Sequence, residues 1–164
     1  MRTETLFDQF ARATNPAVFG IALVLLRVAF GVMFLLSGLS KFGDWSASAY
    51  LAASSGPFAA WFQSLAGNGI VDSLNAWGMV LIGAGLILGL LVRPAAIGGI
   101  ALMVLYYFAA FTSNISHGYI DNHVIYALAL FVLAAGGAGH ALGLNTLALR
   151  SIRKPNAFAR FMLG

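Results

Sequence analysis

The stretch LLRVAFGVMFLLSGLSKF, residues 25–42, decides the fold class. It forms most of an apolar run at residues 17–40, in which Arg27 is the single charged residue. A helix of about 20 apolar residues is long enough to cross the hydrocarbon core of a bilayer. The apolar residues follow one another without the alternation of a membrane barrel strand, so we predict a membrane-spanning helix.

Three further apolar runs of similar length follow, at residues 76–92, 94–112 and 121–142. The chain of 164 residues is 60% hydrophobic and only 9% charged, whereas about 25% of the residues of a soluble domain are charged. A soluble fold of this length cannot bury so much apolar surface, which excludes a soluble enzyme. We therefore predict an all-α integral membrane four-helix bundle, a single domain whose partner is the lipid bilayer.

The distribution of lysine and arginine predicts the orientation of the bundle. With four spans, seven basic residues share the side of the two termini: Arg2, Arg12, Arg93, Arg150, Arg153, Lys154 and Arg160. The opposite side has Lys41 alone. Basic residues favour the cytoplasmic side, so we expect both termini in the cytoplasm and a multi-pass protein of the cytoplasmic (inner) membrane. No basic face of the kind that binds nucleic acid is formed, and no nucleic-acid partner is expected.

A long outer loop, residues 43–75, separates the first two spans and is rich in aromatic side chains. Tryptophan and tyrosine favour the membrane interface, so we expect short interfacial helices in this loop. They can form an aromatic belt or a lid over a small-molecule site, and the sequence leaves both open. The flanking segments 1–16 and 146–164 mix apolar with basic residues, which is typical of segments that lie in the interface.

Arg27 is the most informative residue, because an arginine at the centre of a membrane helix costs about 2.5–3.5 kcal/mol on insertion scales. Its partner can be a carboxylate, backbone carbonyls, water or an anionic or quinone-like ligand. The alternative is a side chain that reaches the lipid headgroups. Arg27 shares one helical stripe with Gly31, Phe34 and Gly38, which favours a position inside the bundle where glycines let a neighbouring backbone approach.

Polar residues gather at the predicted outer end of the bundle: Lys41, Asp44, Asp72, Asn114, His117, Asp121, Asn122 and His123. Aspartate and histidine can exchange protons, so Asp121 and His123 are candidates for a proton relay. Their spacing is not diagnostic of a metal site, and we predict none. The chain has no cysteine, which excludes disulfides, thiolate nucleophiles and iron–sulfur clusters.

Three stretches together resemble the DoxX/DoxD-like family of four-helix membrane proteins. They are LLRVAFGVMFLLSGLSKF at residues 25–42, GAGLILGLLVRPAA at residues 83–96, and DNHVIYALALFVLAAGGAGHALGLN at residues 121–145. The order and spacing of the stretches are more specific than any one of them. Many relatives have a carboxylate early in the second span, whereas residues 77–82 contain none.

The resemblance implies a membrane subunit of a quinone-linked oxidoreductase system. On this interpretation the quinone contacts or proton-relay residues are Arg27, Lys41, Asp121, His123 and Tyr126, and Tyr106 and Tyr107 line the same pocket. Because the chain has no cysteine and no dinucleotide-binding pattern, a quinone or a partner subunit has to supply the redox centre.

A second interpretation remains open, in which the chain is a non-catalytic assembly or anchoring subunit of a larger membrane complex. Small size, few polar groups and glycine-rich helix faces suit this role. A carrier built around Arg27 is a weaker third interpretation, because four helices form a narrow bundle without an inverted repeat. Other membrane subunits or a homo-oligomer are the expected protein partners, and catalysis by this chain itself stays undecided.

Overall fold

The computed structural model describes residues 15–116, 118–152 and 156–163, and the regular elements in these ranges are helices. Four are long: α2 (Pro16–Leu39), α5 (Gly69–Leu88), α6 (Val92–Ala109) and α8 (Asn122–Ala135). Five are short: α3 (Ser48–Ala52), α4 (Ala59–Ser64), α7 (Phe111–Asn114), α9 (Asn145–Ser151) and α10 (Ala157–Leu163). The predicted all-α membrane protein is thereby confirmed. Most of the predicted segment 1–16, His117 and the basic residues at positions 153 and 154 lie outside the described residues.

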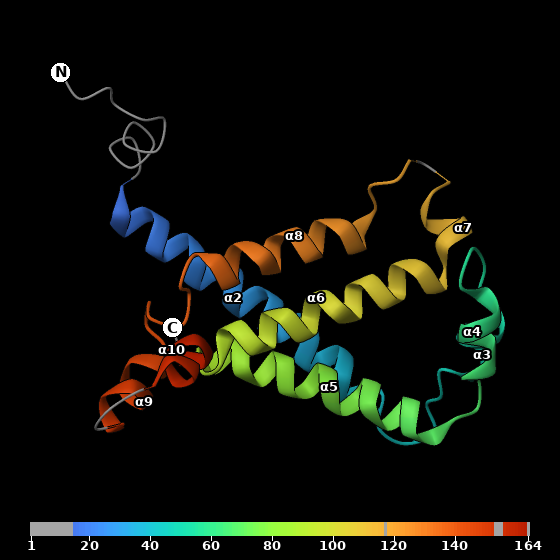
Figure 1. Cartoon of the computed structure of the whole chain (residues 1–164), viewed down its shortest axis with the longest axis horizontal. Helices are drawn as coiled ribbons and strands as arrows, with labels where there is room; N and C mark the ends of the chain where they lie inside the picture. The colour runs from blue at the N-terminus through green and yellow to red at the C-terminus, as the bar shows by residue number, and fades with distance from the viewer. Residues whose placement is uncertain (1–14, 117, 153–155, 164) are drawn as a thin grey trace.

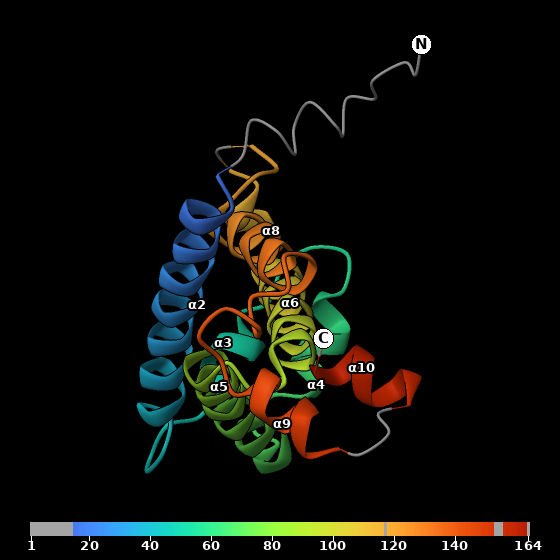
Figure 2. The same cartoon turned by 90° about the vertical axis from the view of Figure 1, so that its left-hand side faces the viewer.

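The four long helices run back and forth between two ends of the molecule (Figure 1). We call the end that carries α3, α4 and α7 the loop end, and the end that carries α9 and α10 the tail end. Seen along its length, the molecule has α2 and α5 side by side and α8 over α6 (Figure 2). Which end faces the cytoplasm stays a prediction.

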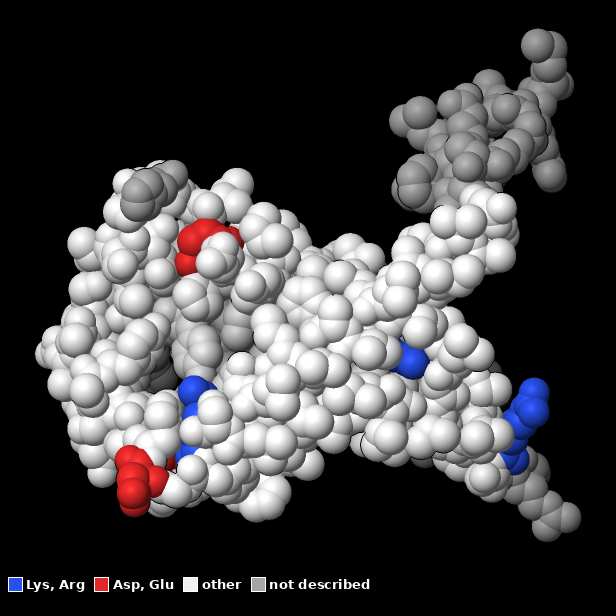
Figure 3. Space-filling view, turned by 180° about the vertical axis from the view of Figure 1, so that it is seen from behind, with Lys and Arg blue, Asp and Glu red and all other residues white. Residues whose placement is uncertain are grey.

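Charges are segregated between the two ends. The described acidic residues, Asp44, Asp72 and Asp121, belong to the loop end together with Lys41, whereas Arg93 and Arg150 belong to the tail end. On the face shown in Figure 3, the acidic side chains lie at the loop end and the long middle of the molecule is almost free of charge. A charge-free middle suits a segment surrounded by hydrocarbon.

The first helix agrees with its predicted span to one residue at each end. Asn15 caps α2 by accepting hydrogen bonds from the backbone of Ala17 and Val18, and Pro16 occupies the first turn, where its missing N–H costs nothing. Its buried stripe includes Arg27, Gly31, Phe34 and Gly38, as predicted.

The second and third helices are displaced from their predicted spans of 76–92 and 94–112. Helix α5 begins seven residues earlier, at Gly69, because the Asn68 side chain caps it. It ends before Gly89, whose φ of +63° suits a left-handed helix cap. The outer loop is therefore shorter than the predicted 43–75, and α3 and α4 are its short helices.

The predicted fourth span, residues 121–142, is wrong at its far end. Helix α8 stops at Ala135 because a glycine-rich segment follows, in which Gly137 has a φ of +62°. Its 14 residues cover about 21 Å at the usual rise, less than the hydrocarbon core of about 30 Å. Of the described helices, α2, α5 and α6 are long and apolar enough to cross a membrane.

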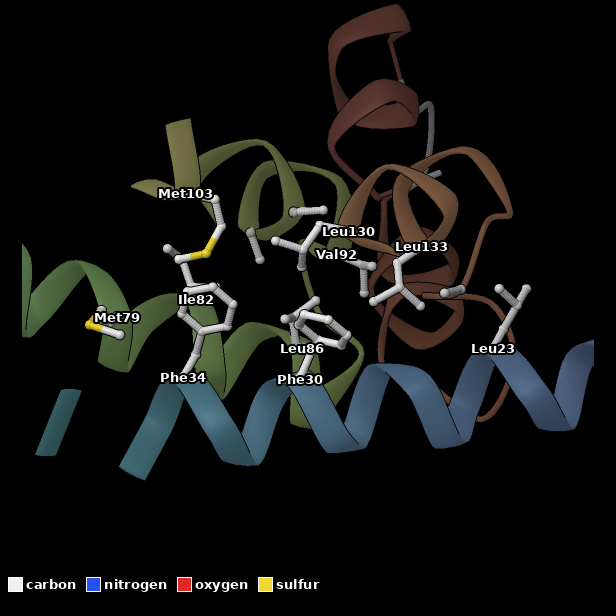
Figure 4. Close-up of a cluster of buried hydrophobic side chains, with 13 residues drawn as sticks. Leu23, Phe30, Phe34, Met79, Ile82, Leu86, Val92, Met103, Leu130 and Leu133 are labelled. Atoms are coloured by element: carbon white, nitrogen blue, oxygen red, sulfur yellow. The ribbon is translucent and has the colours of Figure 1, made fainter. Parts of the chain in front are cut away.

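Two helix pairs meet over the core, whose side chains Figure 4 shows converging from α2, α5, α6 and α8. The backbones of α2 and α5 approach closely through glycine. A Cβ atom added to Gly31 would lie 2.7 Å from Cγ1 of Ile87, and one added to Gly38 would lie 2.7 Å from the backbone nitrogen of Val80. Real side chains do not come so close, so glycine is required at both positions. The predicted role of these glycines is thus confirmed.

Candidate functional site

Arg27 is buried, with 2% of its surface exposed, and its hydrogen-bond partners are backbone carbonyls. One terminal nitrogen donates to the oxygens of Ala138 (2.5 Å) and Ala141 (3.0 Å), and the other donates to the oxygen of Leu142 (3.1 Å). These carbonyls belong to the irregular segment that follows α8. Backbone groups outside a helix have to find partners inside a membrane protein, and Arg27 supplies them.

Glycines make room for this arginine. A Cβ atom at Gly89 would lie 2.6 Å from an Arg27 terminal nitrogen, and one at Gly143 would lie 2.9 Å from it. Beside them, buried Asn145 donates its backbone N–H to the oxygen of Gly89 (3.0 Å) and accepts the N–H of Leu91 with its side-chain oxygen (2.8 Å). Arg27 and Asn145 therefore join α2, the α5–α6 turn and the segment after α8.

At the loop end, α3 and α4 form a cap over the ends of α5 and α6. The carboxylate of Asp72 accepts the backbone N–H of Ala47 (2.9 Å), which holds the start of α3 against α5. The backbone N–H of Ser55 donates to the oxygen of Ala109 (3.1 Å), and the Ser55 hydroxyl accepts the N–H of Thr112 (3.2 Å). This α3–α4 cap is thus attached to both helices that it covers.

A cavity of about 320 Å³ lies beneath the α3–α4 cap. Its lining is largely apolar and comes from α3, α4, α5 and α6: Ala47, Tyr50, Leu51, Trp61, Phe62, Leu65, Val71, Leu74, Asn75, Leu102, Leu105, Tyr106 and Ala109. Small-molecule sites in proteins have volumes of about 300–1,000 Å³, mostly apolar walls and a few converging polar groups. The cavity has each of these properties.

Three polar side chains form one wall of the cavity. The Tyr106 hydroxyl donates to the side-chain oxygen of Asn75 (2.8 Å), and the Tyr50 hydroxyl donates to the backbone oxygen of Tyr106 (3.2 Å). The amide N–H₂ group of Asn75 has no acceptor among the described residues. The wall therefore offers a neutral donor to a ligand inside an apolar chamber.

The Asp121–His123 pair lies next to this wall. A carboxylate oxygen of Asp121 is 2.6 Å from Nδ1 of His123, and its other oxygen accepts the N–H of Val124 at the start of α8 (3.1 Å). Burial alone would raise the pKa of Asp121, but these hydrogen bonds outweigh burial and hold the pKa below its usual range. The His123 ring meets the Tyr106 ring edge to face, with centres 6.1 Å apart.

The other predicted site residues lie elsewhere. Lys41 sits over the Trp45 ring, 4.2 Å from its centre, and burial lowers the pKa of its ammonium group. Tyr126 packs its ring against Phe30, with centres 5.4 Å apart, within the bundle. Arg27 is held at the segment after α8. The structure thus brings Asp121 and His123 together with Tyr106. Arg27 and Lys41 contact other parts of the chain, and Tyr126, one turn after His123 on α8, packs against Phe30.

Sequence reasoning missed Tyr50, Asn75 and Asn145. Asn75 could have been noticed as an amide next to an apolar run, since such groups need a partner in a membrane. No comparable signal marks Tyr50, because its role depends on α3 folding back over α6. Asn145 ends the stretch 121–145 that resembles the family, but the sequence does not reveal that its side chain reaches the α5–α6 turn.

These features define an all-α membrane protein with a capped apolar cavity beside an aspartate–histidine pair. The DoxX family model matches residues 22–112, more than half of the chain, and the protein belongs to the DoxX family. The match covers α2 from residue 22 onward, the α3–α4 cap, α5 and α6, whereas Asp121, His123 and the segment that binds Arg27 follow it. No curated protein and no solved structure matches the chain.

Proposed function

We propose that this DoxX protein is a membrane subunit of a quinone-linked oxidoreductase system and that its capped cavity binds the quinone head group. The observation that carries the proposal is the position of the Asn75–Tyr106 wall, which faces the cavity on one side and meets the Asp121–His123 pair on the other. The segregated charges support an orientation in which the tail end faces the cytoplasm and the cavity lies in the outer leaflet.

The residues of the cavity fit a quinone head group. Its ring is flat and apolar, which suits the aromatic lining from Trp61 and Phe62. Its carbonyl oxygens accept hydrogen bonds, and the Asn75 amide has N–H groups to donate. An apolar chamber makes such a hydrogen bond stronger than it would be in water.

The chemistry of a bound quinone is its reduction to a quinol, which takes up two electrons and two protons. We assign the electrons to a redox-active partner subunit, since this chain has no cysteine and no dinucleotide-binding pattern. We assign proton exchange to His123, which Asp121 orients and whose ring packs against Tyr106 of the cavity wall. This chain then contributes the binding site and, beside it, a residue that exchanges protons.

Tryptophan fluorescence tests binding directly, because Trp61 lines the cavity while the other two tryptophans, Trp45 and Trp77, do not. In a Trp45→Phe/Trp77→Phe variant, a short-tailed ubiquinone or menaquinone analogue should quench Trp61 with a saturable titration. The matched control is Trp45→Phe/Trp61→Phe, which retains Trp77, packed against Phe42 outside the cavity, and should show only weak, non-saturable quenching. Adding Asn75→Leu to the first variant should weaken saturable binding about tenfold, the loss of about 1.4 kcal/mol expected for a buried hydrogen bond. Equal quenching of the two reporters would contradict the proposal.

A further inference from the structure

A long apolar groove leads away from the capped cavity along the outside of the bundle. It lies between α5 and α6, has a volume of about 640 Å³, and runs from Leu74 near the loop end to Leu88 and Leu91 near the tail end. At the usual helical rise, the distance along α5 from position 74 to position 88 is about 21 Å. The groove therefore follows much of the length of a membrane-spanning helix.

The groove and the cavity share part of their walls. Leu74, Leu102 and Leu105 line both. A molecule with a head group in the cavity can therefore extend an attached chain past these three leucines without leaving an apolar surface. This continuity favours an occupant that has a head group and an attached apolar chain. A helix from another protein could cover the groove but would leave the cavity at its end empty.

We propose that the groove holds the apolar tail of a long-chain quinone whose head group lies in the capped cavity. This inference rests on the proposed function and adds the substrate class: a quinone with a long isoprenoid tail rather than a short-tailed or tail-free one. A phospholipid acyl chain has the same apolar chemistry, but its phosphate needs a cationic or multiple-donor site. Neither the cavity nor the groove is lined by a lysine or an arginine.

Small residues keep the groove open. Its floor and rims include Gly78, Ala84, Gly85, Ala95, Gly98 and Ala101. A Cβ atom at Gly78 would meet no atom within 4 Å, and one at Gly98 would meet only Ile82 side-chain atoms, at 3.6 Å. A larger side chain at either position would thus enter the groove without striking the backbone. Gly78 follows Leu74 by one helical turn, so a leucine there would obstruct the groove just beyond the cavity.

The test compares two quinones of the same head group in detergent micelles, with Trp61 of the Trp45→Phe/Trp77→Phe variant as the reporter. The long-tailed natural quinone should bind about tenfold more tightly than the short-tailed analogue, a difference of about 1.4 kcal/mol. Gly78→Leu should remove this difference and leave the affinity for the short-tailed analogue unchanged. The matched control is Gly20→Leu, since Gly20 also has no atom within 4 Å of an added Cβ but lies in α2, outside the groove. Gly98→Leu, on the opposite wall, should repeat the effect of Gly78→Leu.

Each other outcome has a definite meaning. Binding of the short-tailed analogue without any advantage for the long tail would overturn the groove assignment and leave the proposed function standing. A long-tail advantage that survives Gly78→Leu and Gly98→Leu would also overturn it. Displacement of the long-tailed quinone, but not of the short-tailed analogue, by phosphatidylglycerol would assign the groove to phospholipid instead. Absence of binding by both quinones would overturn the proposed function and, with it, this inference.

Discussion

The guanidinium group of Arg27 donates a hydrogen bond to the backbone oxygen of Ala138, across 111 positions of the sequence. The two residues join the middle of the first long helix to the irregular segment after the last one. Ala138 itself is fully buried. The charged side chain of Arg27 therefore donates hydrogen bonds to the backbone of its own chain. These bonds satisfy carbonyl groups of the segment after α8, which explains why that segment can leave the helical conformation inside the bundle.

Replacing Arg27 by leucine should destabilise the protein by about 1–3 kcal/mol, because the buried carbonyl of Ala138 is left without its donor. Arg27→Lys should retain only part of the stability that Arg27→Leu loses, since an ammonium group lacks the planar guanidinium fork that reaches three carbonyls. Thermal unfolding in detergent measures both. Arg150→Leu, at an exposed position of α9, is the matched control and should unfold at nearly the wild-type temperature. Equal stability of the Arg27 and Arg150 variants would refute this role.

The close approach of α2 and α5 leads us to a second prediction, on the stability of a glycine variant at their contact. A Cβ atom at Gly83 would lie 2.7 Å from the backbone oxygen of Gly31, so Gly83→Ala has to push the helices apart. We expect a loss of about 1–3 kcal/mol, the usual effect of overpacking. Gly20→Ala, with open space around it, should be neutral or stabilising by up to about 1 kcal/mol, because alanine favours helix. Thermal unfolding of the Gly83→Ala and Gly20→Ala variants measures the difference. Equal stability of the two variants would be evidence against tight packing of α2 on α5.

The lowered pKa of Asp121 leads us to expect that the stability of the protein depends on pH. The pKa of Asp121 is lowered in the folded protein, so its charged form stabilises the fold above the ordinary carboxyl pKa of about 3.9. This contribution is lost as the pH falls through the lower folded-state value. Asp121→Asn keeps a capping side chain but cannot titrate, so it should be less stable than wild type by about 1 kcal/mol at neutral pH. The difference should shrink in acid. A constant difference down to about pH 2 would contradict the assignment.

Of two adjacent tyrosines on α6, Tyr106 lines the cavity and Tyr107 does not. The Tyr106 hydroxyl bonds Asn75 at the cavity wall, whereas the Tyr107 hydroxyl donates to the backbone oxygen of Tyr119 (3.0 Å). Tyr106→Phe removes the hydrogen bond that holds the Asn75 side chain at the cavity wall. It should therefore weaken binding of a short-tailed quinone about tenfold, a loss of about 1.4 kcal/mol in binding free energy. Tyr107→Phe should leave it unchanged. Titration of Trp61 fluorescence measures both, and equal losses in the two variants would remove Tyr106 from the site.

Local patterns predicted the parts of the structure that depend on neighbours in sequence. The cap and first turn of α2, the buried stripe with Arg27 and the packing glycines of that helix follow from residues within a few positions. Asp121 and His123 were paired for the same reason, since they are two residues apart. The end of α8 was not predictable, because its apolar run continues to Leu142 and only the fold shows that the carbonyls beyond Ala135 reach Arg27.

The cavity could not be predicted from sequence for a related reason. Its polar wall combines Tyr50, Asn75 and Tyr106, which lie in three different helices. Their meeting depends on where the α3–α4 cap folds back over α6, and no periodicity encodes that position. The sequence leaves a quinone and backbone carbonyls among the possible partners of Arg27, and the structure places its guanidinium group on carbonyls of the segment after α8.

Native mass spectrometry of the protein, extracted gently from its own membranes, tests the central claim most directly. The account predicts an adduct with the mass of a long-chain quinone on the wild-type chain, and its loss in the Asn75→Leu variant but not in Tyr107→Phe. Foreign subunits in stoichiometric amounts together with a quinone adduct would fit a redox complex. Foreign subunits without an adduct on the wild-type protein would contradict the claim and identify this chain as an anchoring component.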